Sequence, residues 1–230
     1  IEDAVAGADV VVIGTPLSTT EKIFPQIVAS LKSSAVLTDV GSAKGSVVIT
    51  AKKIMGDNFS HFVPGHPIAG TEQSGVEASF AELFIDHRVI LTPLDVTDAS
   101  AHKLITKMWQ VVGAEVINLD VKHHDDVLAA TSHLPHMLAY ALVDCLAGMQ
   151  ECEEIFKYAA GGFADFTRIA SSNPEMWHDI CFSNRDALLN SLELFSAHIN
   201  EIKGAIESSD SEHLLSIFKR AKKVRDQFTK

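Results

Sequence analysis

The sequence predicts an α/β protein in which an incomplete, largely parallel Rossmann-type sheet precedes an all-helical domain. Strand and helix patterns alternate over the first 119 residues, as expected for parallel strands joined by helical crossovers. From Asp120 onward the strand pattern stops and apolar residues recur at helical spacing. The 230 residues are enough for two domains, which we place at residues 1–119 and 120–230.

Short apolar runs in the first part are the predicted strands. Val10–Ile13 consists of β-branched residues throughout, as in strands buried on both faces. The predicted strands are Val10–Ile13, Ala35–Val40, Phe59–Val63, Arg88–Thr92 and Ala114–Asn118. Helices are predicted between them over about residues 18–31, 44–55 and 99–112. A capping box, Ser18-x-x-Glu21, opens the first helix.

The second part has the start signals and apolar spacing of several helices. Asn173-Pro174 predicts a helix start, with asparagine as the N-cap and proline in the first turn. Ser209-x-x-Glu212 predicts the start of the last helix. Apolar residues three and four positions apart fit a core face and a helix-to-helix dimer seam equally well. They include Leu188, Leu192, Phe195, Ile199 and Ile202.

Composition excludes several classes of partner. The net charge of -11 argues against binding to a phosphate backbone, so we expect no nucleic-acid partner. No apolar run approaches the roughly 20 residues of a membrane span, so we expect no membrane partner. Three cysteines without a C-x-x-C pattern fit a reducing cytoplasm.

Two motifs combine histidine with a rigid proline and with small or hydroxyl residues. Gly65-His-Pro-Ile-Ala-Gly-Thr71 follows a predicted strand, and we expect His66 to lie in a loop there. Ser132-His-Leu-Pro-His136 lies in a helical pattern, where Ser132 and His136 share one face. An imidazole held in a fixed position can serve as a proton acceptor, with a pKa of about 6.5. The alternative for each histidine is a buried, hydrogen-bonded structural role.

Two loops of small residues follow the first two strands. In a doubly wound sheet, ligands bind beyond the carboxyl ends of the strands. We therefore predict that these loops bind a dinucleotide cofactor. The candidate cofactor-binding residues are Gly14, Thr15, Pro16, Gly41 and Ser42.

Two further charged stretches allow alternative interpretations. Arg168 follows paired glycines and offers a planar fork for a carboxylate, or else a surface salt bridge to Asp165. His123–Asp126 resembles a metal-ligand cluster, but adjacent helical residues point about 100° apart. We interpret this run as a solvated helix start and predict no metal site.

Five motifs, in order along the chain, resemble the prephenate and arogenate dehydrogenase family of tyrosine biosynthesis. This resemblance implies an NAD- or NADP-dependent oxidative decarboxylation and a homodimer formed through the helical domain. The motifs are Asp39-Val-Gly-Ser-Ala-Lys44, Gly65-His-Pro-Ile-Ala-Gly-Thr-Glu72, Ser132-His-Leu-Pro-His136, Gly161-Gly-Phe-Ala-Asp-Phe-Thr-Arg168 and Pro174-Glu-Met-Trp177.

The resemblance also implies roles for individual residues. His66 would accept the proton of the substrate hydroxyl, with Ser42 orienting it. Arg168 would hold a substrate carboxylate, and Trp177 would line the site or reach the partner subunit's site. The full set of implied substrate-binding residues is Ser132, His136, Arg168, Thr71, Glu72, Gly161, Asp165 and Trp177.

The front of the chain departs from the family pattern. The family begins with a βαβ unit bearing G-x-G-x-x-G, which these residues lack. We therefore expect a longer parent protein and weak dinucleotide binding by these 230 residues alone. The choices between NAD and NADP, and between prephenate and arogenate, stay open. The alternatives are a dehydrogenase of the 6-phosphogluconate or β-hydroxyacid type, a catalytically silent dimerisation fragment, and a metal hydrolase.

Overall fold

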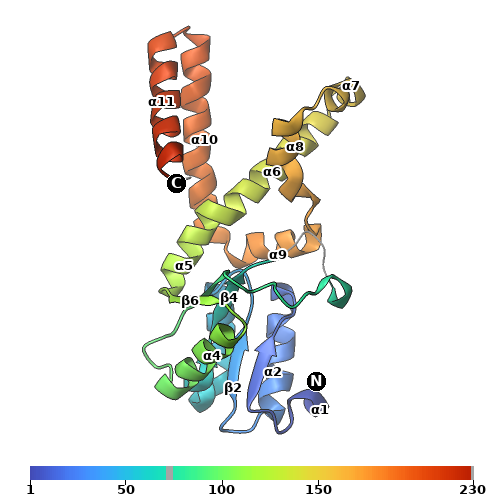
Figure 1. Ribbon diagram of the computed structural model, residues 1–230, viewed down its shortest axis with the longest axis vertical. Helices are drawn as coiled ribbons and strands as arrows, with labels where there is room; N and C mark the ends of the chain where they lie inside the picture. Colours follow the sequence, from blue (N-terminus) through green and yellow to red (C-terminus); the bar gives the residue numbers. More distant parts are fainter. Residues whose placement is uncertain (71–74, 229–230) are drawn as a thin grey trace. The chain divides into compact units, whose positions relative to one another are not determined.

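The structure is a computed structural model that describes residues 1–70 and 75–228 (Figure 1). The chain divides into two compact units, Ile1–Leu188 and Leu189–Lys230, here called unit 1 and unit 2. Unit 1 extends across residue 119, so the predicted domain division at that residue stays a prediction.

Unit 1 contains two short sheets that combine parallel and antiparallel pairs. In the first, β1, β2 and β3 pair in parallel in that order. In the second, β4 pairs antiparallel with β5, and β5 pairs in parallel with β6. The strands are β1 (Val10–Ile13), β2 (Val36–Asp39), β3 (Phe62–Val63), β4 (Gly65–Ile68), β5 (Arg88–Leu91) and β6 (Glu115–Asn118). The predicted Rossmann-like architecture is confirmed, with β4 as the antiparallel exception.

Helices cover both faces of the sheet in unit 1. Leu37 of β2 lies in a core with residues of α2 and α3, whereas its neighbour Val36 lies in a second core with residues of α4. Because successive strand residues point to opposite faces, α2 and α3 cover one face and α4 covers the other. The helices here are α1 (Glu2–Val5), η1 (Leu17–Thr19), α2 (Thr20–Ser30), α3 (Gly45–Met55), η2 (Gly56–His61) and α4 (Ala99–Val111).

The rest of unit 1 is helical, as predicted. Asn173 caps α9 through its side chain, which accepts from the backbone N–H of Met176 at 2.9 Å, and Pro174 begins the helix. Pro135 likewise lies in the first turn of α6, directly after a π-helical turn. The elements are α5 (Val121–Leu128), η4 (Ala129–His133), α6 (Leu134–Ala147), α7 (Cys152–Lys157), α8 (Gly161–Thr167), η5 (Arg168–Ser171) and α9 (Pro174–Ser183).

The strand that carries His66 differs from the prediction. We expected a strand over Phe59–Val63 and then a loop, but Phe59 lies in η2 and His66 lies in β4. Pro64 lies between the consecutive strands β3 and β4, and its carbonyl accepts a hydrogen bond from the N–H of Thr92 at 2.9 Å. The chain therefore continues as a strand along β5, and His66 is held by a ladder and not by a loop.

Two predicted helix starts and one burial prediction were wrong in detail. The Ser18 N–H bonds the Asp179 carboxylate at 3.2 Å, and α2 begins at Thr20. Asp210 accepts from the N–H of His213 at 2.9 Å and caps the last helix in place of Ser209. Val12 is 45% exposed on β1, which pairs with β2 alone among the described residues, so the prediction of burial on both faces was wrong.

Unit 2 is a helical hairpin made of the rest of α10 (Arg185–Glu207) and α11 (Ser211–Phe228). His213 of α11 lies 2.9 Å from the carboxylate of Glu201 on α10. Both helices also expose large apolar side chains, including Leu194, Ile206 and Phe218. An apolar face of this kind is typical of a surface that another chain covers.

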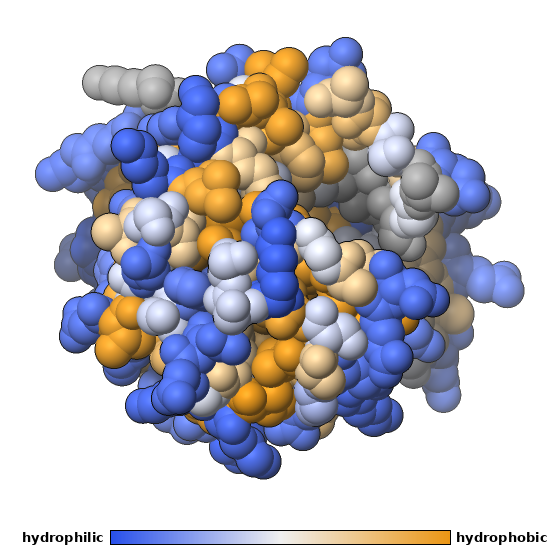
Figure 2. Space-filling model, turned by 90° about the horizontal axis from the view of Figure 1, so that it is seen from below, coloured by the Kyte–Doolittle hydropathy of each residue, from blue (hydrophilic) through white to orange (hydrophobic). Residues whose placement is uncertain are grey.

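The surface is mixed in character. Figure 2, seen from below Figure 1, shows hydrophilic residues over much of this end of the molecule, with apolar patches between them. Within the described residues, no helix is long and apolar enough to cross a bilayer.

Candidate active site

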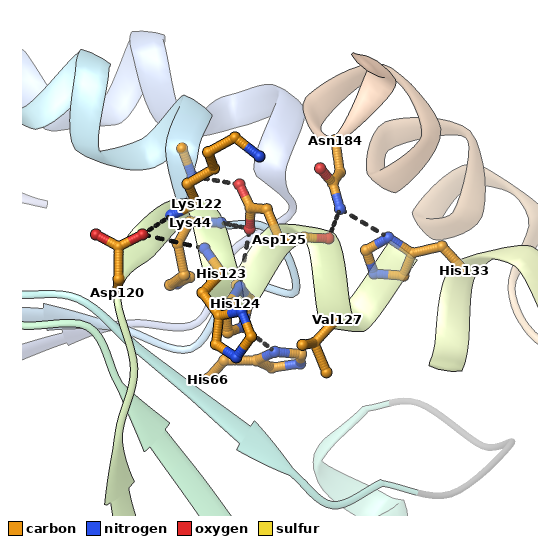
Figure 3. Close-up of polar contacts among 12 residues, drawn as sticks. Lys44, His66, Asp120, Lys122, His123, His124, Asp125, Val127, His133 and Asn184 are labelled. Carbon is orange, nitrogen blue, oxygen red and sulfur yellow. Dashed lines mark hydrogen bonds and ion pairs between the residues drawn. The ribbon is translucent and has the colours of Figure 1, made fainter. Parts of the chain in front are cut away.

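A cluster of buried polar side chains lies where α3, β4, α5 and α9 meet (Figure 3). Every member is at most 8% exposed, although polar and charged groups normally stay near water. Burial of this kind is costly unless the groups pair with one another. The members are Asp39, Lys44, His66, His124, Asp125, His133 and Asn184.

Asp125 of α5 joins the helical segment to the sheet. Its two carboxylate oxygens accept hydrogen bonds from the backbone N–H groups of Lys44 and Gly45, each at 2.8 Å. These N–H groups lie at the first turn of α3, where they lack partners within the helix. The positive end of the α3 dipole also favours a carboxylate there. Asp125 thus serves as the N-terminal cap of a helix distant in sequence.

The same carboxylate begins a line of hydrogen bonds that ends at His66. Asp125 Oδ1 lies 2.8 Å from His124 Nδ1, and His124 Nε2 lies 2.9 Å from His66 Nδ1. A carboxylate only accepts, so His124 donates from Nδ1, and the neutral form of its ring then accepts at Nε2. His66 then carries its hydrogen on Nδ1, which leaves the Nε2 lone pair as a proton acceptor.

The pKa values in this line favour a charged Asp125 and a neutral His66. Burial raises the pKa of Asp125, but hydrogen bonds from His124 and two backbone N–H groups outweigh it, so the pKa lies below its usual value. Burial lowers the pKa of His66 well below 6.5, and electrostatic interactions with Lys44, His124 and His133 lower it further. His66 therefore remains able to accept a proton well into the acid range.

Lys44 fixes the backbone beside His66. Its fully buried ammonium group forms an ion pair with Asp39 and donates to the Gly65 carbonyl at 2.6 Å. Burial lowers the pKa of Lys44, and the charge of Asp39 opposes this effect. Asp39 in turn accepts from the N–H groups of Gly41 at 2.9 Å and Gly65 at 3.2 Å. The ion pair therefore ties β2, its loop and the start of β4 together.

His136 and Trp177 form the second half of the site. Their rings stack with centroids 3.6 Å apart. Trp177 is buried and makes this contact with a histidine of its own chain. His136 Nδ1 lies 2.8 Å from the carbonyl of Ser132 and donates to it, so Nε2 is an acceptor in the neutral ring. Burial lowers the pKa of His136, although the bond to Ser132 opposes it. The backbone carbonyl of Ser132 thus orients His136, and the predicted contact of both residues with one ligand stays a prediction.

The candidate cofactor residues lie together at one edge of the sheet. Ile13 is the register partner of Asp39, so the loops after β1 and β2 leave the sheet side by side. Gly14, Thr15 and Pro16 are exposed, and Gly41 and Ser42 are half-buried. Ser42 stays a predicted partner of His66, whose Nδ1 is hydrogen-bonded to His124.

Gly41 allows these two loops to approach each other. A Cβ atom at this position would lie 2.7 Å from Leu17 Cδ2 and 3.0 Å from Asp39 Oδ2. Only glycine therefore permits the present packing. A tight, small-residue edge at the carboxyl ends of parallel strands fits the approach of a dinucleotide to the backbone.

The remaining predicted residues lie outside the buried cluster or outside the described residues. Gly161 and Asp165 are exposed on α8, and Arg168 is exposed on η5. Both elements pack against α6, and the Tyr140 hydroxyl of α6 donates to the Ser172 carbonyl at 2.6 Å. Thr71 and Glu72 lie outside the described residues.

The prediction of a solvated helix start at His123–Asp126 was half wrong. His123 and Asp126 are exposed, but His124 and Asp125 are buried in the cluster. A signal was present, because His124 and Leu128 are four residues apart and share the buried face of α5. Sequence reasoning also gave no role to His133 and Asn184.

Both parts of the chain match domains of one enzyme family. Residues 2–118 match the prephenate dehydrogenase nucleotide-binding domain, and residues 120–220 match the prephenate dehydrogenase dimerization domain. The chain belongs to the prephenate dehydrogenase family. A cyclohexadienyl dehydrogenase of Zymomonas mobilis is 41% identical over 98% of this chain and 77% of that protein. A prephenate dehydrogenase of Bacillus subtilis is 36% identical over 95% of this chain and 59% of that protein.

Solved structures of family members have the same fold. Prephenate dehydrogenase from Aquifex aeolicus, in complex with hydroxyphenyl propionate and NAD+, is 40% identical with a TM-score of 0.90. That match covers 99% of this chain and 78% of the other. Synechocystis arogenate dehydrogenase is 25% identical with a TM-score of 0.83, over 100% of this chain and 82% of the other.

A methyl group at Gly45 is expected to disturb the Asp125 cap. The Cβ atom of Gly45→Ala would lie 2.9 Å from Asp125 Oδ2, so the carboxylate must move. We expect a loss of about 1–3 kcal/mol in unfolding free energy, measured by chemical denaturation, as for other overpacked sites.

The matched control is Gly204→Ala in α10, where an added Cβ would meet no atom within 4 Å. It is expected to raise stability by about 0.5–1 kcal/mol, because alanine is the better helix former. Equal stability of the two variants would mean that the Asp125 cap contributes nothing.

Proposed function

We propose that this chain carries the catalytic site of a prephenate dehydrogenase, which oxidatively decarboxylates prephenate to 4-hydroxyphenylpyruvate. One observation carries the proposal. The Asp125–His124–His66 line presents a neutral imidazole acceptor next to the sheet edge that suits a dinucleotide. This part of the chain also matches the prephenate dehydrogenase nucleotide-binding domain.

His66 is the proposed base. Its Nε2 accepts the proton of the substrate's ring hydroxyl as the adjacent C–H is oxidised. Asp125 and His124 hold the tautomer that leaves Nε2 unprotonated, and they stabilise the imidazolium that forms. Loss of the ring carboxylate as carbon dioxide then yields the aromatic product.

Residues of the helical segment are proposed to bind the end of the substrate that lies away from its ring hydroxyl. His136 Nε2 and the guanidinium of Arg168 are proposed to contact substrate oxygens, with Arg168 holding a carboxylate. Trp177 keeps His136 in place by stacking on it. Ser132, Gly161 and Asp165, with Thr71 and Glu72 of the undescribed segment, complete the proposed substrate-binding set.

NAD is the proposed cofactor, held at the edge formed by Gly14, Thr15, Pro16, Gly41 and Ser42. When bound, it supplies the hydride acceptor. A relative of 40% identity was solved with NAD+, which supports NAD over NADP. The three free cysteines support placement in the cytoplasm.

The function is tested by steady-state assays of the natural full-length protein. With prephenate and NAD we expect NADH and carbon dioxide in equal amounts, and NADP and arogenate are tested in parallel. Turnover of short β-hydroxyacids without turnover of prephenate or arogenate would show that the protein is a dehydrogenase of the other type.

Arg168→Gln is expected to raise the KM for prephenate by orders of magnitude, with a smaller change in kcat. Losing a charge-assisted hydrogen bond to a substrate carboxylate costs roughly 1.5–3 kcal/mol, which is about 10- to 100-fold in KM. Arg185→Gln is the control, because Arg185 is an exposed arginine paired with Asp186 at 3.1 Å. If both variants keep the wild-type KM, the surface salt-bridge interpretation of Arg168 is correct.

The helical part is proposed to form a homodimer, as the match to the dimerization domain suggests. Sedimentation at micromolar concentration should give twice the monomer mass. Phe218→Asp places a charge on the exposed apolar face of α11 and should weaken the dimer, whereas Lys219→Asp is its matched control. A monomeric wild-type protein contradicts this proposal.

A further inference from the structure

His133 is a buried titratable residue to which the chemistry above gives no role. It is 1% exposed and lies in the π-helical turn η4. Its ring meets Trp177 edge to face, with centroids 6.0 Å apart, and contacts Asn184 on its other side. It therefore lies between the residue that stacks on His136 and the start of α10.

Asn184 determines which nitrogen of His133 carries the hydrogen. The Asn184 Nδ2 group lies 2.8 Å from the Asp125 carbonyl and 3.2 Å from His133 Nδ1 (Figure 3). The carbonyl can only accept, so an NH2 group must occupy this position. Its second hydrogen then points at His133 Nδ1, which accepts it. The neutral ring consequently carries its hydrogen on Nε2.

The ring stays neutral over the working pH range. Burial lowers the pKa of His133 to about 4, and electrostatic interactions with His124 and His136 act in the same direction. The charge of Asp125 opposes them without reversing the shift. His66 also lies near enough for the two rings to affect each other. His133 is thus a fixed donor and not a second base.

This donor has no hydrogen-bond partner among the described residues. The Nε2 atom is buried, and so is the similarly unpaired Nε1 of Trp177 beside it. An unpaired buried N–H costs free energy, so each one in a native fold needs an explanation, and a bound ligand that supplies the acceptor is one. Figure 3 shows Nε2 on the edge of the ring that faces away from Asn184.

We infer that His133 is a ligand-binding residue whose Nε2–H donates a hydrogen bond to an oxygen acceptor of the bound substrate. This inference rests on the proposed function and adds a contact to it. A carboxylate or carbonyl oxygen of the substrate has the required chemistry. The carboxamide oxygen of the nicotinamide has the same chemistry, and the experiment distinguishes the two sources.

His133→Phe in the natural full-length protein removes the donor and keeps an aromatic ring. The KM for prephenate and the Kd for hydroxyphenyl propionate with NAD+ present are measured, together with the Kd for NAD+ alone. We expect a substrate-side loss of about 10- to 100-fold, the effect of one hydrogen bond to a charged group. The factor should be equal at pH 6 and pH 8, because the donor does not titrate there.

The pattern of losses identifies the ligand. Weaker prephenate or hydroxyphenyl propionate binding with unchanged NAD+ binding assigns the oxygen to the substrate. A loss confined to NAD+ assigns it to the nicotinamide and overturns the substrate contact. If a folded His133→Phe variant keeps the wild-type KM and Kd values, the inference is wrong. The proposed function would still stand as long as the wild-type protein turns over prephenate.

Trp109→Phe is the matched control. It also removes a buried, unpaired N–H, but Trp109 lies in the core that packs α4 against the sheet. Its affinities should equal those of the wild type.

Imidazole NMR of the wild type tests the donor without any variant. His133 should show the Nε2–H tautomer at pH 6, and its Nε2–H signal should shift when hydroxyphenyl propionate is added with NAD+. The opposite tautomer, or a signal that the ligands leave unchanged, overturns the inference even if His133→Phe does not fold.

Discussion

His66→Asn is expected to lower kcat about 10²–10⁴-fold, the usual contribution of a general base. Asparagine keeps a polar group of similar reach but cannot take the proton of the substrate hydroxyl. KM should change little, because the lost interaction matters most as charge develops in the transition state. Steady-state kinetics of the natural full-length protein measure both constants.

The pH profile provides a second measurement on the same variant. The sequence suggested an acid limb near 6.5, but burial and neighbouring charges lower the pKa of His66 well below that value. Since the base must be neutral, wild-type kcat/KM should fall only at pH values below 6.5. This limb should be missing in His66→Asn.

His123→Asn is the control, because His123 is the exposed neighbour of His124 on α5. It should retain wild-type kinetics. Full activity of His66→Asn, or an acid limb that persists in it, would falsify the assignment and point to His136 as the base.

Asp125→Asn is expected to lower kcat by about 10²–10⁴-fold through a change of tautomer, the range found when such a carboxylate is neutralised. Asp125 accepts hydrogen bonds on both oxygens, from two backbone N–H groups and from His124. An amide NH2 must face one of these donors. If the NH2 replaces Oδ1, it faces both His124 and the Lys44 N–H. The His124 ring then reverses its tautomer, and His66 becomes protonated on Nε2.

The alternative amide orientation instead leaves the Gly45 N–H facing an NH2 group. An unsatisfied buried donor costs about 1–3 kcal/mol, so unfolding free energy should also fall. Asp126→Asn is the matched control, since Asp126 is the exposed neighbour whose carboxylate pairs with Lys122 at 2.5 Å. Wild-type kcat together with an unchanged unfolding free energy in Asp125→Asn would mean that Asp125 contributes neither to the reaction nor to the cap of α3.

Local pattern in the sequence was sufficient for much of the fold. Short apolar runs predicted β1 and β2 to within one residue, and Asn173-Pro174 predicted the start of α9. Local signals failed where a partner distant in sequence decided the outcome. Ser18 has the pattern of an N-cap, yet its N–H bonds Asp179, 161 positions away along the chain.

For the site, the sequence by itself determined the motifs, the family they resemble and the choice of His66 as the base. Only the tertiary structure decided what surrounds that base. His124 and Asp125 read as a solvated pair because charge in a sequence carries no information about burial. Their role depends on α5 lying against the N-terminus of α3, which pairs residues about 80 positions apart. Long-range hydrogen bonds set tautomers and pKa values, and these bonds exist only once the chain has folded.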